Sequence, residues 1–184
     1  MEKTHIQILI QQSSEGDMKS FAELVDIYQP LVFRLAFRLL GNEDDAKDMV
    51  QETFIKIWSS IDKYNPDYKF STWIYRIAGN TCYDRLRSTL YSAEERADFD
   101  ISSLSIVSGE NVESAMINKE LKELIVFLTY ELTPKQKLVF TLKDLEELEI
   151  DEIVTITGLT PAKIKSNLYL ARKYIREKIN RKEY

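Results

Sequence analysis

Residues 150–180 read IDEIVTITGLTPAKIKSNLYLARKYIREKIN, and this stretch decides the fold. Its first part, about 150–156, has apolar residues at helical spacing and ends at Thr157-Gly158, a common helix stop. Thr160-Pro161 then places a capping residue before a proline at the first helical position, which predicts a final helix to about Asn180. A short helix, a glycine-containing turn and a capped second helix form the helix-turn-helix pattern.

The final helix has two chemically different faces. Five apolar residues recur at helical spacing and are expected to be buried: Ile164, Leu168, Ala171, Ile175 and Ile179. The other face is mostly basic and polar: Pro161, Lys163, Lys165, Ser166, Asn167, Tyr169, Arg172, Lys173 and Arg176. In a major groove, Asn and Lys can contact base edges, while Ser, Tyr and Arg can hold phosphates. The face therefore favours DNA binding, and a solvated basic face is the alternative.

Charge is distributed unevenly along the chain. The 184 residues hold 25 Lys and Arg against 30 Asp and Glu, a net charge of -5. The last 24 residues, from Pro161 to Tyr184, carry eight bases and two acids, a net charge of +6. An acidic total therefore hides a basic segment suited to nucleic acid, and it favours weak DNA binding by the isolated chain.

Composition excludes several classes of protein. With 5 Gly, 4 Pro and no sustained strand alternation, the chain is expected to be all-α. One cysteine, Cys82, and one histidine, His5, argue against a disulfide framework, a metal site or a Ser-His-Asp triad, so we expect no cofactor, metal or enzyme activity. The sequence contains no membrane-length apolar run and no signal-peptide pattern, which predicts a cytoplasmic protein not inserted in a membrane.

A linker is expected between two small helical domains. Residues 89–111 are rich in Ser, Asp, Glu and Gly and have weak periodicity, which predicts a flexible acidic linker. This places a first domain at 1–88 and a second at 112–184, which contains the helix-turn-helix.

The expected helix 43–58 carries acidic and aromatic side chains. Ala46, Val50, Thr53 and Ile57 form its predicted inner stripe. The rest could be a protein-docking face with an acidic rim and aromatic anchors: Asp45, Asp48, Gln51, Glu52, Phe54 and Trp58. The alternative is a solvated acidic flank with its aromatic residues in the core.

Aromatic residues also surround the loop before the next helix, which is expected to be capped by Ser71 or Thr72 and to reach Arg87. They are Tyr64, Tyr68, Phe70 and Trp73, and the helix adds Arg76, Asn80, Tyr83 and Arg87 on one face. Such a mixture suits unstacked single-stranded bases, which stack on aromatic rings. The alternative assigns the aromatic residues to the core and the polar stripe to solvent.

Two sets of motifs resemble a known family. GNEDDAKDMVQETFIKIW (41–58), FSTWIYRIA (70–78) and NTCYDRLR (80–87) resemble the second conserved region of extracytoplasmic-function sigma factors. LTPKQ (132–136), EIDEI (149–153), KIKSNL (163–168) and Ala171-Arg172 resemble the fourth region of the same family. The resemblance covers about residues 15–180 apart from the linker.

The resemblance implies a transcription initiation factor. It implies that the acidic helix face docks on the clamp helices of core RNA polymerase. It further implies that the 62–73 loop and the following helix recognise and melt the promoter -10 element, through Tyr64, Phe70, Thr72, Trp73, Arg76, Asn80, Tyr83, Asp84 and Arg87. The last helix would contact the -35 element, and an anti-sigma factor would cover the same faces.

The chain departs from the family pattern at three positions. Asn167 and Leu170 stand where the family often has Arg, which reduces attraction to phosphates. Gly79 precedes Asn80 inside a predicted helix, where Gly costs about 1 kcal/mol relative to Ala, so a neighbour or nucleic acid is expected to approach closely there.

Three other functions compete with this interpretation. A conventional helix-turn-helix regulator with a sensing or dimerising first domain would bind duplex DNA tightly without polymerase. An enzyme finds no support in a nucleophile setting, phosphate loop or metal spacing. An adaptor without DNA binding would tolerate acidic replacements of Lys165 and Arg172.

Overall fold

The computed structural model describes the backbone of residues 2–94 and 124–182. Every regular element in these ranges is helical, which confirms the all-α prediction. The first group of helices comprises α1 (Glu2–Ser14), α2 (Met18–Leu40), α3 (Glu43–Trp58), the 3-10 turn η1 (Ile61–Lys63) and α4 (Phe70–Glu94). The second group comprises a helix over 124–129, α6 (Pro134–Phe140), the π-helical turn η3 (Thr141–Leu145), α7 (Ile150–Thr157) and α8 (Pro161–Lys182).

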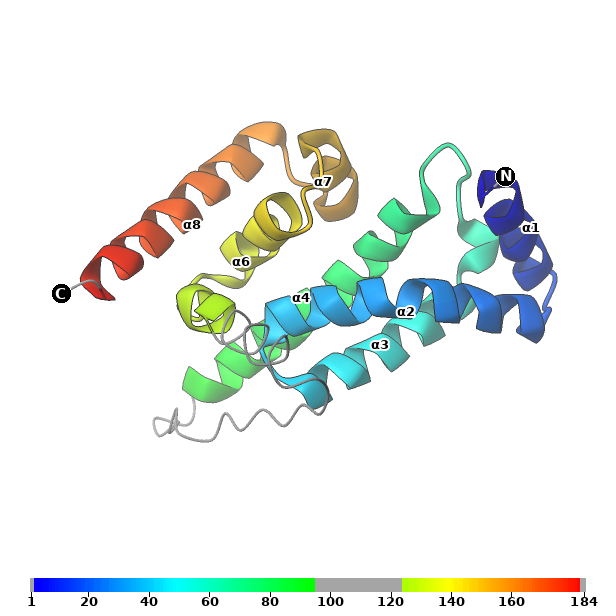
Figure 1. Ribbon diagram of the computed structural model, residues 1–184, viewed down its shortest axis with the longest axis horizontal. Coiled ribbons are helices and arrows are strands. Elements are labelled where there is room, and N and C mark those ends of the chain that lie inside the picture. Colours follow the sequence, from blue (N-terminus) through cyan, green and yellow to red (C-terminus); the bar gives the residue numbers. More distant parts are fainter. Residues whose placement is uncertain (1, 95–123, 183–184) are drawn as a thin grey trace, which may run out of the picture.

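Helix α2 is the long central element of the first group (Figure 1). Asp17 caps it by accepting hydrogen bonds from the backbone N–H groups of Lys19 and Ser20, both at 3.2 Å. Gly41 ends it in the left-handed conformation, φ +73°, and donates its N–H to the Phe37 carbonyl at 2.8 Å. The helix runs unbroken through Pro30, although a proline inside a helix removes one backbone hydrogen bond.

Helices α3 and α4 pack against α2 and complete the first core. The predicted inner stripe of α3 is confirmed, since Ala46, Val50, Thr53 and Ile57 are all buried. On α4, the buried Phe70, Ile74, Ala78 and Cys82 lie on one side. Helix α4 begins at Phe70 itself, so neither Ser71 nor Thr72 caps it, and it continues to Glu94.

The extended α4 corrects the predicted start of the linker. Residues 89–94 are helical, whereas the sequence placed the linker at 89–111. Thr89 shows one reason, because its hydroxyl donates to the Arg85 carbonyl at 3.0 Å inside the helix. The remainder of the proposed linker, and the predicted helix start near Val112, lie outside the described residues. The domain limits 1–88 and 112–184 stay predictions.

The second group forms a smaller core around α8. Ile164, Leu168 and Ala171 are buried against α6 and α7, as predicted. Ile175 is half-buried, and Ile179 is 42% exposed. The prediction that Ile179 is buried was therefore wrong.

The two groups pack against each other through α4, α6 and α7. A Cβ atom on Gly79 of α4 would lie 3.5 Å from Leu138 Cδ1 of α6, an ordinary van der Waals contact. The predicted approach of a neighbour at Gly79 is thus confirmed, and the neighbour comes from the second group. One connected set of buried apolar residues spans both groups.

Candidate nucleic-acid and protein interfaces

The helix-turn-helix is fixed by local capping at both of its helices. At the start of α7, the backbone N–H of Glu149 donates to the Glu152 carboxylate at 3.3 Å in a capping box. Gly158 ends α7 with φ +68° and donates its N–H to the Val154 carbonyl at 2.8 Å. Thr160 then accepts from the Lys163 N–H at 3.3 Å. These local bonds set the turn that orients α8.

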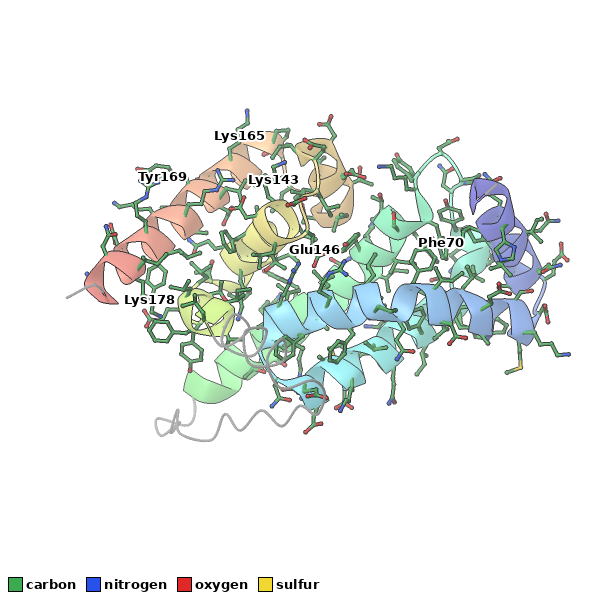
Figure 2. The ribbon with its side chains drawn as sticks, viewed as in Figure 1. Phe70, Lys143, Glu146, Lys165, Tyr169 and Lys178 are labelled. Atoms are coloured by element: carbon green, nitrogen blue, oxygen red, sulfur yellow. The ribbon has the colours of Figure 1, made fainter. Side chains whose placement is uncertain are left out.

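Helix α8 presents the predicted basic face to solvent. Seven members of the set are exposed along with Tyr169, whose exposed fraction is 66%: Pro161, Lys163, Lys165, Ser166, Arg172, Lys173 and Arg176. Asn167 is half-buried, and its amide donates to the Lys163 carbonyl at 2.7 Å. Lys165 and Tyr169 project outward from α8 (Figure 2). The face is convex and cationic, as a duplex-binding surface requires.

One base of this face is already paired. The Arg172 guanidinium donates from Nε and Nη2 to the two carboxylate oxygens of Asp144, at 2.9 and 2.6 Å. These bonds raise the pKa of Arg172 above its ordinary value. A planar guanidinium fits a carboxylate in this two-point geometry. Arg172 is therefore held beside η3 rather than extended toward a ligand.

The loop before α4 encloses a cluster of four aromatic rings. Phe70 lies at its centre, with ring centroids 5.1 Å from Tyr64, 5.4 Å from Tyr28 and 5.6 Å from Trp73. The Tyr64 hydroxyl donates to the Tyr68 carbonyl at 2.5 Å, and burial raises the pKa of that hydroxyl. These contacts hold the loop in one shape, which suits a platform for an unstacked base.

Two residues predicted to contact DNA lie in the core instead. Phe70 and Thr72 are 5% and 6% exposed, so neither is available to a base in this structure. Phe70 was included as one of the aromatic residues around the loop, and Thr72 through the family resemblance. Phe70 supports Tyr64 and Trp73, whose half-buried rings it contacts, while Tyr68 is exposed.

The outer face of α4 carries the remaining predicted residues. Arg76, Asn80, Asp84 and Arg87 are exposed and recur at helical spacing, while Tyr83 is half-buried between them. This stripe continues from the aromatic loop along the helix. The structure thus brings the loop and the polar stripe together on one element.

The acidic residues of α3 are arranged as predicted, with one exception. Asp48, Gln51 and Glu52 are exposed. Asp45 is half-buried, and its carboxylate accepts from Arg85 Nη2 of α4 at 2.6 Å, so it also ties α3 to α4. Phe54 is buried, whereas Trp58 is 37% exposed.

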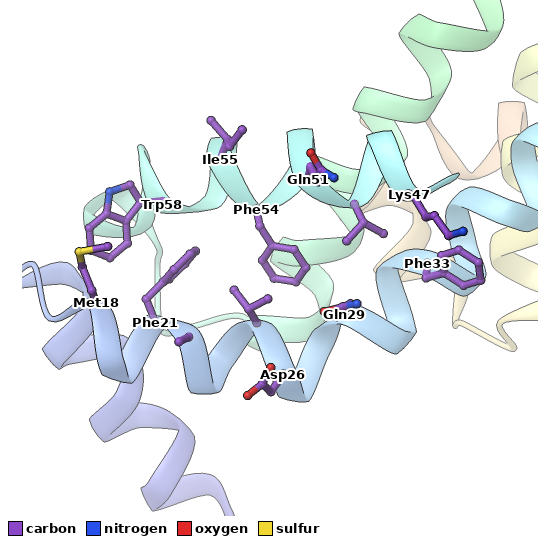
Figure 3. Close-up of a pocket in the computed structure, with 13 residues that line it drawn as sticks. Met18, Phe21, Asp26, Gln29, Phe33, Lys47, Gln51, Phe54, Ile55 and Trp58 are labelled. Atoms are coloured by element: carbon purple, nitrogen blue, oxygen red, sulfur yellow. The ribbon is translucent and has the colours of Figure 1, made fainter. Parts of the chain in front are cut away.

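An apolar groove of about 770 Å³ runs between α2 and α3. Figure 3 shows Phe54 pointing from α3 into this groove, with Met18, Phe21 and Trp58 toward one end and Phe33 toward the other. The Phe21 and Trp58 rings lie 4.8 Å apart. Asp26, Gln29 and Gln51 supply a polar rim. Such a groove fits the apolar face of an amphipathic helix.

Sequence reasoning missed the α2 side of this groove. Phe21 and Val25 lie at helical spacing on α2, but both are only half-buried. Met18 is 75% exposed and was not selected. An exposed methionine beside two aromatic residues is the signal that could have indicated the groove.

Sequence reasoning also missed a charged cluster between the groups. Glu146, directly after η3, accepts hydrogen bonds from Arg34 and Arg38 of α2 and from Tyr75 of α4. A signal was present: Arg34 and Arg38 interrupt the apolar stretch 31–40 one turn apart, which indicates a counter-charge nearby.

The described residues show no metal or membrane feature. No three His, Cys, Asp or Glu side chains gather closely enough there to ligate a metal ion. In the same part of the chain, no helix is both long and apolar enough to cross a membrane.

Comparisons with known proteins agree on one family. Residues 24–89 match the model of Sigma-70 region 2, and residues 126–175 match that of Sigma-70, region 4. The chain is 33% identical to the ECF RNA polymerase sigma factor SigW of Bacillus subtilis over 176 residues, covering 92% of this chain and 94% of that protein. It is 34% identical over 181 residues to the ECF RNA polymerase sigma-E factor of Escherichia coli K12, covering 94% and 93%.

Two solved structures share the fold. CnrH, in complex with the cytosolic domain of CnrY, superposes with a TM-score of 0.68 at 21% identity, covering 96% of this chain and 97% of that one. RpoE of Bartonella quintana, in complex with the anti-sigma factor NepR, gives 0.67 at 21% identity, covering 89% and 98%. Together with the sequence matches, these findings show that the chain belongs to the ECF sigma factors, the family of promoter-specific transcription initiation factors of RNA polymerase.

Proposed function

We propose that three faces of the chain divide the work of initiation. The α3 face and its groove bind core RNA polymerase, the α4 stripe with its aromatic loop binds the melted -10 element, and the α8 face contacts the -35 element as duplex. One observation carries this proposal. The acidic and apolar α3 face, the aromatic and polar α4 stripe and the basic α8 face lie on separate exposed surfaces of a chain with the fold of this family. The role needs no catalytic residue and no cofactor in the chain.

The groove supports a helical protein partner on the α3 face. It has Phe54 inside, Trp58 and Met18 at one end and a polar rim, which is the anatomy of a protein interface. Asp48 and Glu52 lie on the same helix and would attract a basic partner. The polymerase clamp helices are the partner that this function requires.

The same groove also suits an anti-sigma factor. CnrH was solved with the cytosolic domain of CnrY, and the Bartonella RpoE with the anti-sigma factor NepR. A partner that fills the α2–α3 groove would exclude polymerase directly. We place the chain in the cytoplasm, where its polymerase and promoters are found.

The DNA-binding faces are expected to be weak alone. The basic segment carries +6 within a chain of -5, and Arg172 is partly neutralised by Asp144. Joining two modest modules on polymerase raises their effective concentration at a promoter. Free protein should therefore bind duplex DNA weakly, and core polymerase should confer promoter-specific initiation.

In vitro transcription with core polymerase on genomic DNA, with mapped start sites, tests the proposal. Wild type should start at a small set of promoters. Lys165→Glu with Arg176→Glu should abolish those starts, whereas Lys19→Glu, an exposed lysine outside the three faces, should preserve them. Tight, sequence-specific duplex binding without polymerase, and no starts with it, would instead identify a conventional helix-turn-helix regulator.

A further inference from the structure

Glu146 is a buried carboxylate whose partners come from the other group of helices. Its side chain is only 2% exposed. It accepts from Arg34 Nη2 at 2.9 Å, from Arg38 Nη1 at 2.6 Å and from the Tyr75 hydroxyl at 2.7 Å. Arg38 Nη1 also donates to the Leu145 carbonyl at 2.6 Å. A buried charge is costly unless it is fully paired, so these contacts exist only while the two groups are packed together.

The segment that carries Glu146 has an unusual backbone. Its N–H bonds to the Thr141 carbonyl at 2.9 Å, five residues back, which closes the π-helical turn η3. Glu147 follows with φ +57°, the one non-glycine residue with positive φ in the described ranges. Such features are retained mainly where they position a functional group. Here they turn Glu146 and the Leu145 carbonyl toward α2.

Further contacts close the interface around this cluster. A Cβ atom on Gly41 would lie only 2.9 Å from Val126 Cγ1, so the glycine permits close packing against the 124–129 helix. Lys69 Nζ lies 3.0 Å from the Glu152 carboxylate of α7. The closed arrangement is therefore specific at several points rather than a loose collapse.

The closed arrangement conflicts with simultaneous use of both DNA-binding faces. Elements centred near -35 and -10 are separated by roughly 25 base pairs, or about 85 Å of duplex at ~3.4 Å per base pair. In the closed state α6 packs against both α4 and α8. Packed helix axes are about 8–10 Å apart, so α8 lies roughly 20 Å from α4. The groups must separate before both elements can be bound.

We propose that Glu146, Arg34, Arg38 and Tyr75 form an autoinhibitory clasp. The clasp holds the two groups closed in the free protein, and it is broken when polymerase and promoter DNA bind the open form. This inference rests on the proposed function, because inhibition has meaning only if both faces act on one promoter. A binding-competent state that is rarely populated lowers apparent affinity in proportion to its population.

Dye-pair distances measure the clasp directly. Dyes at Lys19→Cys on α2 and Glu177→Cys on α8 report the separation of the groups, and both sites are exposed, while Cys82 is fully buried and stays unlabelled. Wild type should show mainly the short distance. Glu146→Gln should shift the closed-to-open ratio by about tenfold or more, because it leaves two arginines without their carboxylate. Tyr75→Phe, on the opposite side, should shift it in the same direction by less.

The matched control is Glu147→Gln. Glu147 is the next residue, is exposed and makes no described side-chain contact, so the same change in charge should leave the distance distribution unchanged. Circular dichroism checks that each variant folds. If Glu146→Gln does not fold, Tyr75→Phe tests the clasp in its place, because Tyr75 is the partner of Glu146 on α4.

Transcription with core polymerase measures the consequence. If Glu146→Gln raises the open-to-closed ratio tenfold, the factor concentration that gives half-maximal transcription should fall by up to tenfold. Glu147→Gln should need the same concentration as wild type. An unchanged dye distance, or an open variant with unchanged half-saturation, would overturn the clasp. If no variant and no wild type initiates transcription, the proposed function falls and the autoinhibitory role with it, while the dye pair still decides whether the clasp closes the molecule.

Discussion

The α3 groove and the α8 face are built in opposite ways. The groove is concave, has apolar side chains inside and an acidic helix beside it, and the Asp45–Arg85 pair ties that helix to α4. The α8 face is convex and basic, and most of its side chains extend into solvent. The comparison teaches that affinity for a protein partner at the groove should come from buried aromatic area, whereas affinity for DNA at the α8 face should come from charge.

Trp58→Ala should have the largest effect, because it removes the exposed aromatic anchor of the groove. An aromatic anchor of a protein interface contributes about 2–4 kcal/mol, so affinity for core polymerase should fall by about 30- to 1000-fold. A titration of labelled factor with core polymerase measures it. Ile8→Ala, which truncates another exposed apolar residue on α1, should change affinity by less than about twofold. Equal losses for the two variants would show that the groove is not the docking site.

Salt dependence should separate the two faces next. Each phosphate contact contributes about 0.9 to the slope of log K against log salt, so Lys173→Gln with Arg176→Gln should reduce the slope of promoter binding by about 1.8. The measurement is holoenzyme binding to promoter DNA between about 50 and 200 mM salt. Binding of factor to polymerase should keep its own slope in this double variant. A slope that stays at the wild-type value would remove both residues from the DNA contact.

A buried amine distinguishes the second group from the first. Lys137 of α6 is 5% exposed, whereas the buried polar residues described in the first group are serines and threonines. Burial lowers the pKa of Lys137 to about 8. Because the charged form is disfavoured in the folded state, the cost to stability is full below pH 8 and declines as pH rises toward the ordinary value of 10.5.

Lys137→Met should therefore stabilise the protein by roughly 1–3 kcal/mol at pH 7, since it keeps most of the length of the side chain and removes the charge. Denaturant unfolding at pH 7 and pH 10 measures the difference. The advantage of methionine should shrink at the higher pH. Lys135→Met, at an exposed position two residues earlier on α6, should show no such dependence on pH. An advantage that is constant with pH would mean that packing rather than charge is responsible.

Local chemistry explains which features the sequence could predict. The limits of α3 and the helix-turn-helix follow from residues such as Asn42, Gly158 and Thr160, whose capping bonds join neighbours in the chain. The end of α4 was missed because residues 89–94 lack the apolar periodicity that marks a helix. The role of Phe70 could not be assigned from the sequence, because aromatic residues suit both a core and a base platform.

Long-range pairing explains what the sequence could not predict. The Glu146 cluster joins residues separated by 71 to 112 positions, so no local pattern assigns partners to Arg34 or Arg38. The groove depends on how α2 and α3 are spaced, which is set by packing rather than by either helix alone. Sequence therefore indicates which residue types a face carries, and the fold decides which of them are accessible.

Asp144→Asn should have the smallest effect, and its sign separates two roles for the pair with Arg172. If Asp144 competes with DNA, the variant frees the guanidinium and removes one negative charge beside the α8 face. Exposed ion pairs contribute about 0.2–1 kcal/mol, so promoter affinity should rise by about 1.4- to fivefold. If Asp144 instead holds Arg172 in the conformation that binds a phosphate, affinity should fall.

We expect the rise, because both carboxylate oxygens occupy the guanidinium edge that a phosphate would need. Holoenzyme binding to one promoter fragment measures it, with Asp151→Asn, exposed on α7, as the matched change in charge.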